Sequence, residues 1–366
     1  MFFITFIALY LIANGWIFYS AWPLIRPLPP ILKIAATVLF AAVVLLFPSL
    51  MFFRDELGSG RFGNFLYSAS SVWLAITLYL TLLLIAAALL RLLGIIVPHS
   101  FGICCAITAV LLVYGYLNFN RPVVRNLKIE LAGDTAANGE PRQLRIAAVS
   151  DIHLGHGIAK KRLEKYVSLI NSREPDLILI CGDLVDSSVE PLYECKMEEE
   201  LGLLKARYGI YMVPGNHEYI SGIEKCGAFI RLTPIVLLRD SVVTIEGMVN
   251  IVGRDDRSNR RRKSVRELMD DTENRLPTII LDHQPADTEV ESAVKEKAAL
   301  ALYGHTHKGQ IWPFSLLTGA IYAHDYGYGK IGQTHIYVSS GLGLWGPPLR
   351  IGSRSEIAVI ELTLRN

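Results

Sequence analysis

The stretch Leu144-Arg145-Ile146-Ala147-Ala148-Val149-Ser150-Asp151-Ile152-His153 decides how the second part of this chain folds. Its apolar beginning predicts a buried strand, and Asp151 and His153 follow directly after it. Residues two apart in an extended segment point to the same side, so a carboxylate and an imidazole are directed toward one point. The stretch therefore predicts ligands for a divalent metal at the carboxyl end of a strand.

Further clusters of the same kind follow short apolar runs along the chain: Gly182-Asp183, Gly215-Asn216-His217-Glu218, Asp282-His283 and Gly304-His305-Thr306-His307. Each alone is ordinary turn chemistry. Together with the first they hold five of the nine histidines. Ligands gather outside the carboxyl ends of strands in open α/β sheets, so the clusters predict one shared site. No cysteine lies among them, which argues against a structural zinc site.

The pattern around these clusters predicts an α/β sandwich with mixed sheets. Strands are expected at Leu127–Leu131 and Leu144–Val149, on both sides of a polar turn at Thr135–Gln143. Helices at Leu163–Ile170 and Met197–Ala206 then alternate with strands at Leu177–Ile180, Ile210–Val213, Val249–Val252, Thr278–Leu281 and Leu300–Tyr303. The part from Gly309 onward is rich in glycine, tyrosine and β-branched residues and is expected to be all-β.

The first part of the chain has a different character. Of 366 residues 51% are hydrophobic, and only seven charged residues precede Arg121. Apolar stretches of the length that crosses a bilayer as helix lie at Phe2–Trp22, Ile31–Phe53, Tyr67–Leu93 and Phe101–Phe119. We therefore expect an all-α membrane domain of four transmembrane helices over residues 1–120 and a catalytic domain over residues 121–366.

Charge and cysteine usage bear on location and partners. Arg54, Arg61, Arg121, Arg125 and Lys128 would lie on the side of the termini, against Arg26, Lys33 and Arg91 on the other. This excess favours a cytoplasmic catalytic domain. The five cysteines form no disulfide pattern. A net charge of +2 indicates no nucleic-acid partner.

The motifs Ser150–Gly155, Gly182–Asp186, Gly215–Glu218, His283 and Gly304–His307 resemble those of the calcineurin-like metallophosphoesterase superfamily. The resemblance covers roughly Leu127 to Leu364. The stretches Gly304–Gln310 and Tyr337–Glu361 are similar to its bacterial membrane-associated branch. Together with the four expected spans, this implies a multi-pass protein of the bacterial inner membrane. The implied fold is a four-layer α/β/β/α metallophosphoesterase sandwich of mixed sheets, preceded here by the membrane domain.

The resemblance also implies roles by position. One metal ion would be held by Asp151, His153 and His307, and the other by Asn216, His283 and His305, with Asp183 bridging the two. His217 would be the catalytic residue that faces the substrate phosphate. Asp186 would orient a ligand, and Glu218 either does likewise or only starts a helix. The two divalent ions could be Mn, Fe or Zn.

The implied reaction is hydrolysis of a phosphodiester or pyrophosphate by a hydroxide that bridges two metal ions. Ser187-Ser188 follow Asp186 where protein phosphatases of the superfamily carry Arg-Gly, so a protein substrate is disfavoured. The spans favour a lipid-linked phosphate at the bilayer. Soluble or cyclic nucleotides are the first alternative, and a membrane binding or sensory protein with secondary hydrolase activity is the second. The sequence leaves the oligomeric state open.

Two other segments each have two interpretations. One is a basic loop that contains Arg254, Arg257 and Arg260-Arg261-Arg262-Lys263. It is either a solvated loop or a patch for anionic lipid headgroups. The apolar segment Gly341–Leu349 is expected to form a loop near the metals, and its Leu344 and Trp345 are either core residues or a lip for an acyl chain.

Overall fold

The computed structural model describes residues 2–52, 58, 60–132, 141–273 and 275–365. Phe53, Arg54 and most of the polar turn Thr135–Gln143 therefore lie outside the described residues. The chain divides into two compact units. The first is Met1–Leu117 with Gly346–Leu349, and the second is Asn118–Trp345 with Arg350–Asn366. The two units are described separately.

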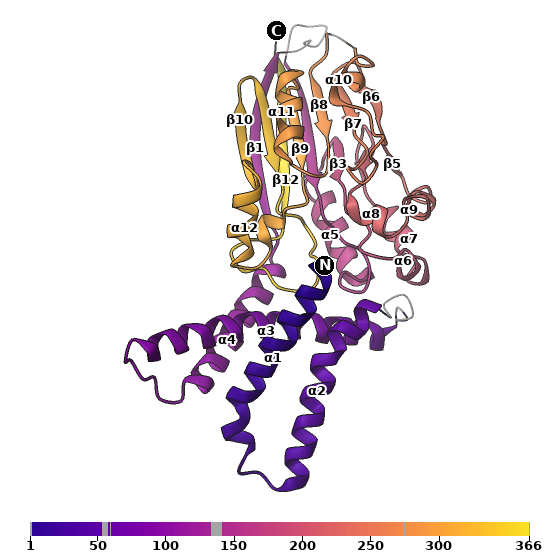
Figure 1. Cartoon of the computed structure of the whole chain (residues 1–366). Coiled ribbons are helices and arrows are strands. Elements are labelled where there is room, and N and C mark those ends of the chain that lie inside the picture. Colours follow the sequence, from indigo (N-terminus) through magenta and orange to yellow (C-terminus); the bar gives the residue numbers. More distant parts are fainter. Residues whose placement is uncertain (1, 53–57, 59, 133–140, 274, 366) are drawn as a thin grey trace. The chain divides into compact units, whose positions relative to one another are not determined.

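The first unit is helical. Its helices are α1 (Phe2–Ile25), α2 (Pro30–Phe52), α3 (Arg61–Leu92) and α4 (Ser100–Phe119), whose last two residues belong to the second unit. These helices cover the four predicted stretches (Figure 1), and each is long and apolar enough to cross a membrane.

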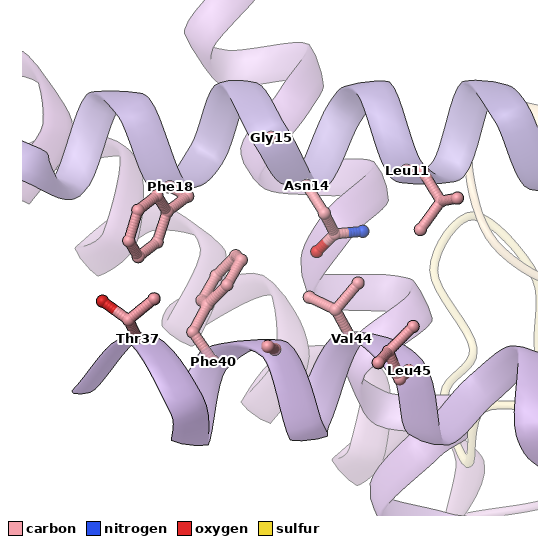
Figure 2. A pocket seen from close by; sticks show the side chains of 9 residues that line it. Leu11, Asn14, Gly15, Phe18, Thr37, Phe40, Val44 and Leu45 are labelled. Carbon is pink, nitrogen blue, oxygen red and sulfur yellow. The ribbon is translucent and has the colours of Figure 1, made fainter. Parts of the chain in front are cut away.

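Buried polar side chains tie the first three helices together. Asn14 on α1 accepts hydrogen bonds from Trp73 Nε1 at 3.0 Å and Thr77 Oγ1 at 3.3 Å, both on α3. Tyr10 donates its hydroxyl to the carbonyl of Val44 on α2 at 2.9 Å. Such bonds between helices replace contacts that lipid cannot supply. Figure 2 shows Asn14 in a mostly apolar pocket between α1 and α2, which Thr37 also lines.

The second unit contains two six-stranded mixed sheets. The first has the order β1-β12-β2-β3-β4-β5, formed by β1 (Val123–Ala132), β12 (Glu356–Arg365), β2 (Arg142–Val149), β3 (Leu177–Cys181), β4 (Ile210–Val213) and β5 (Ile235–Leu237). The second has the order β10-β11-β9-β8-β7-β6, formed by β10 (Gly327–Ile331), β11 (Thr334–Val338), β9 (Leu300–Tyr303), β8 (Thr278–Leu281), β7 (Val249–Gly253) and β6 (Ser241–Ile245). The strands β2, β3 and β4 are parallel, as are β7, β8 and β9.

Side chains on the two faces of each sheet pack into three apolar cores. In β3, Leu177, Leu179 and Cys181 point to a core between the two sheets, and Ile178 and Ile180 point to the other face. That other face is covered by α5 (Lys160–Asn171), α6 (Glu190–Glu194), α7 (Met197–Leu201) and α9 (Ile223–Ile230). The outer face of the second sheet is covered by α10 (Val265–Met269) and α11 (Asp287–Lys295). The expected four-layer α/β/β/α sandwich is thus confirmed.

Two local expectations were wrong. The part after Gly309 is not all-β, because α12 (Phe314–Ile321) forms before β10. The helix expected over Met197–Ala206 ends at Leu201, after which Gly202 and a turn lead toward β4. The short elements β5, β6 and α8 (Asn216–Ile220) were not foreseen, since they are too short for a clear period.

Candidate metal centre

The five clusters lie at the carboxyl ends of β2, β3, β4, β8 and β9. Because neighbouring strands such as β2 and β3, or β8 and β9, are parallel, their carboxyl ends lie at the same edge of the sheet. Backbone hydrogen bonds continue beyond the ends of the strands. Asp151 N donates to Gly182 O at 3.0 Å, and His153 N donates to Asp183 O at 3.0 Å. Gly304 N donates to His283 O at 2.9 Å. Neighbouring clusters are therefore held in fixed register.

Asp151, His153 and His307 form a first group of potential ligand atoms, all from buried residues. The Nε2 atoms of His153 and His307 are 3.1 Å apart, although the residues are 154 positions apart in sequence. Asp151 Oδ1 lies 3.5 Å from His307 Nε2 and 3.9 Å from His153 Nε2. One small cation can be reached by all three atoms.

Asp183, His283 and His305 form a second group, with Asn216 beside them. His283 Nε2 lies 3.1 Å from both Asp183 Oδ2 and Asn216 Oδ1, and 3.3 Å from His305 Nδ1. His283 Nδ1 lies 2.8 Å from the Cys181 carbonyl, to which it can only donate. This bond fixes the tautomer and leaves the Nε2 lone pair directed at the group.

Asp183 lies between the two groups. Its Oδ2 is 3.1 Å from His283 Nε2 and 3.8 Å from His153 Nε2. Burial works to raise the pKa of Asp183, but the close contact with His283 lowers it. A carboxylate with one oxygen near both groups has the position that a shared ligand requires.

The backbone is strained at most of the predicted ligands. Asp151, His153, Asp183, His305 and His307 have positive φ, between 50° and 71°. Left-handed conformations are uncommon outside glycine and concentrate at functional sites, where the surrounding structure compensates their cost. Each of these residues is held there by the hydrogen-bonded loops around it.

Close packing joins the two sheets at the site. His305 N donates to the Asp151 carboxylate at 3.0 Å. A Cβ on Gly304 would lie only 2.5 Å from Asp151 Oδ2 and 2.6 Å from Ser150 Cβ. Any larger residue at position 304 would therefore push the first ligand out of place.

Asp186 contacts two histidines of the site. Its Oδ1 lies 3.5 Å from His153 Nδ1 and 3.4 Å from His217 Nδ1. His217 Nδ1 also donates to the Asp186 carbonyl. Burial works to lower the pKa of His217, but the bond to Asp186 and the charges of Asp183 and Asp186 raise it to about 9. The imidazole is thus held protonated at neutral pH.

Glu218 contacts backbone, with no ligand side chain among its described partners. Its carboxylate accepts from Gly215 N at 2.7 Å, Asp183 N at 3.0 Å and Val185 N at 2.8 Å. Burial, followed by the charge of Asp183, raises its pKa to about 7. Glu218 therefore lies at the start of a helix, which is one of its two predicted roles. Its carboxylate also connects the loop after β3 to the loop after β4.

Arg350 was not foreseen as part of the site. It is fully buried, and its guanidinium donates to the carbonyls of Ser340, Gly341, Gly343 and His307. Its Nη2 lies 3.3 Å from His307 Nδ1. Burial and then the charge of Arg350 lower the pKa of His307, which keeps this imidazole neutral. The available signal was a single arginine between the apolar residues Leu349 and Ile351.

The basic loop is divided by the fold. Arg254 and Arg262 turn inward and pair with buried Asp282, at 2.7 Å and 3.2 Å, and with Glu289. Arg257, Arg260, Arg261 and Lys263 remain exposed. Arg254 and Arg262 therefore belong to an internal ion network and are not part of a patch for lipid headgroups. In the apolar segment, Leu344 is a core residue and Trp345 is exposed.

The residues present fit a divalent metal. The Nε2 atoms of His153 and His307 lie 3.1 Å apart beside the buried carboxylates of Asp151 and Asp183, close enough for one ion to accept lone pairs from both rings. The same set of imidazole, carboxylate and amide oxygen is what such ions accept. Asp151, His153 and His307 would hold an ion at the first group, and Asp183, Asn216, His283 and His305 at the second.

Comparison with known proteins agrees with this geometry. Residues 144–309 match the family model of the calcineurin-like phosphoesterase. An uncharacterized metallophosphoesterase of Helicobacter pylori is 37% identical over 232 residues, 62% of this chain and 61% of the relative. A transmembrane protein with metallophosphoesterase domain of Danio rerio is 33% identical over 273 residues, 70% of this chain and 61% of the relative. The chain thus spans about 61% of the length of these relatives.

Proposed function

We propose that the protein is a membrane-anchored, metal-dependent hydrolase of phosphoric esters, a function supported by the match of residues 144–309 to the calcineurin-like phosphoesterase family. The observation that carries the proposal is the pair of ligand groups with Asp183 between them. Two divalent ions held there would activate water and neutralise charge on the phosphate. The proposed domains are the membrane domain, residues 1–120, and the catalytic domain, residues 121–366.

His217 is the proposed proton donor. Its Nδ1 is engaged by Asp186, and a pKa of about 9 keeps the ring cationic at neutral pH. A cation beside the metal groups can stabilise the charge on a phosphate oxygen and protonate the leaving oxygen. Asp186 acts through His217 and His153 by fixing their rings.

The favoured substrate is a lipid-linked phosphodiester or pyrophosphate. This proposal is supported by the four helices able to span a membrane, which would keep the domain at a bilayer, where such molecules reside. Soluble nucleotides remain the alternative substrate class. In this proposal the bilayer is the bacterial inner membrane, and the catalytic domain is on its cytoplasmic side.

The test compares the full-length protein with Asp183→Ala in nanodiscs supplied with Mn²⁺. Both are assayed on lipid extracts, on nucleotides and on a chromogenic phosphodiester. Asp270→Ala serves as the matched control, because Asp270 is an exposed aspartate. We expect loss of about 100-fold or more in rate for Asp183→Ala alone, because losing even a partner that orients a ligand costs up to about 100-fold.

Each outcome decides one part of the proposal. Equal rates for the folded Asp183→Ala variant and the wild type would refute the metal mechanism. Turnover of nucleotides without turnover of lipids would replace the favoured substrate by the alternative. A cellular effect that persists in Asp183→Ala would favour the membrane binding or sensory function.

A further inference from the structure

Helix α12 and the residue pair before it expose an unusual amount of apolar surface. Trp312, Phe314, Leu316, Leu317 and Ile321 are each between 45% and 67% exposed. The helix buries none of its residues, all of which the structure describes. From Trp312 to Tyr322 the sequence contains no charged residue. Clustered apolar surface of this kind marks an interaction site.

This helix is fixed to the metal-ligand loop. Gly309, two residues after His307, has φ +72°, and a Cβ there would lie 2.2 Å from Ser315 N. Asp325 completes the attachment, since its carboxylate accepts from Thr318 Oγ1 at 2.9 Å and its carbonyl accepts from Thr306 Oγ1 at 2.7 Å. The exposed apolar face is therefore held beside the candidate metal centre.

A second exposed tryptophan lies close to the first. Gln310, two residues before Trp312, makes two hydrogen bonds with Trp345. Its side chain donates to the Trp345 carbonyl at 2.7 Å and accepts from Trp345 N at 3.0 Å. Trp345 is 56% exposed. Tryptophans gather where an apolar phase meets water.

Within the same unit, α12 begins near the point where the chain leaves the last membrane-spanning helix. Asn118, near the end of α4, donates its side-chain amide to the Arg350 carbonyl at 3.2 Å. The next residue, Ile351, accepts from Trp312 N at 2.8 Å. The start of α12 is therefore connected, through Arg350 and Ile351, to the last residues of a helix long and apolar enough to cross a membrane.

We infer that α12, with Trp312 and Trp345, is an interfacial helix that inserts its apolar side chains among the acyl chains of the bilayer. A short helix with an apolar face binds in the interface plane without crossing the membrane. The inserted helix would hold the loop of His305 and His307 at the level of the lipid headgroups. This inference goes beyond the proposed function, because it needs neither turnover nor bound metal.

The test attaches a nitroxide to Leu317→Cys in the full-length protein, reconstituted in nanodiscs of phosphatidylethanolamine and phosphatidylglycerol. Leu203→Cys is the matched control, because Leu203 is 55% exposed and Leu317 is 56% exposed. Collision rates with oxygen, which concentrates in acyl chains, and with a water-soluble nickel chelate are measured. Labelling of the wild-type chain gives the background from its five cysteines.

We expect the label at position 317 to collide severalfold more with oxygen than with nickel, and the label at position 203 to show the reverse. Nickel accessibility at position 317 equal to that at position 203 would overturn the inference. Low collision with both reagents would also overturn it, because it would mean that protein covers the helix. A label at Leu316→Cys repeats the measurement in case Leu317→Cys does not fold. Lipid insertion without lipid hydrolysis would refute only the proposed substrate.

Discussion

At the scale of single residues, Asp186 is the side chain that prepares two histidines for different tasks. It lies 3.5 Å from His153 Nδ1, in the first ligand group, and 3.4 Å from His217 Nδ1. The histidines compensate for the burial of Asp186 and lower its pKa below the usual range. A single carboxylate therefore orients both a proposed ligand and the proposed acid.

Asp186→Asn is expected to reduce metal affinity or activity by about 10- to 100-fold, as loss of a partner that orients a ligand does. The pH dependence should also change. Protonated His217 is lost as pH rises through its pKa of about 9, and removing the carboxylate lowers this pKa. The alkaline limb of the pH–rate profile should therefore move to lower pH.

Glu190→Gln is the matched control for this profile, because Glu190 is a largely exposed carboxylate on the same segment. It should leave both the rate and the alkaline limb in place. An unchanged alkaline limb in Asp186→Asn would contradict the assignment of His217 as the acid.

At the scale of elements, a buried ion network fastens the ends of β7 and β8 to α11. Arg254 follows β7, Asp282 follows β8, and Glu289 lies on α11. Arg262 from the loop between them completes the network at 2.7 Å from Glu289. Because His283 is the next residue after Asp282, the network also supports the second ligand group.

Arg254→Met should destabilise the second unit by about 3–5 kcal/mol, because it leaves a buried carboxylate with too few partners. The free energy of unfolding is measured by denaturant titration of the full chain in detergent micelles. Arg260→Met is the control, since Arg260 is exposed. Equal stability of the two variants would show that the network contributes nothing.

At the scale of the whole molecule, the end of α4 is part of the second unit. Phe119 is buried in its core, under Arg162 Cζ at 4.1 Å from the ring centroid. Arg162 Nη2 donates to Asn120 Oδ1 at 2.7 Å. The last residues of α4 are therefore part of the core of the second unit.

A fragment of residues 118–366 should be more stable than a fragment of residues 121–366 by about 1.5–3 kcal/mol, the value of burying one phenylalanine. Unfolding of both purified fragments in mild detergent measures the difference. The longer fragment with Phe119→Ala should lose most of its advantage. Equal stability of the two fragments would place Phe119 outside the cooperative core.

The sequence by itself determined the fold class, the four spans and the residues offered as ligands. These follow from local signals, because hydrophobic periodicity marks strands and helices, and donor type with spacing marks a ligand. Asp151-x-His153 and His305-x-His307 are legible in this way. Element ends were less accurate, since α12 interrupts a tail rich in strand-forming residues.

Only the tertiary structure decided which distant residues meet and which charges are removed from water. His153 and His307 meet across 154 positions because two sheets pack face to face. Arg254 and Arg350 became internal cations, although the sequence around them resembles a surface loop or an apolar run. Packing among the described residues also leaves every residue of α12 at least partly exposed. Burial depends on long-range packing, which a local pattern does not contain.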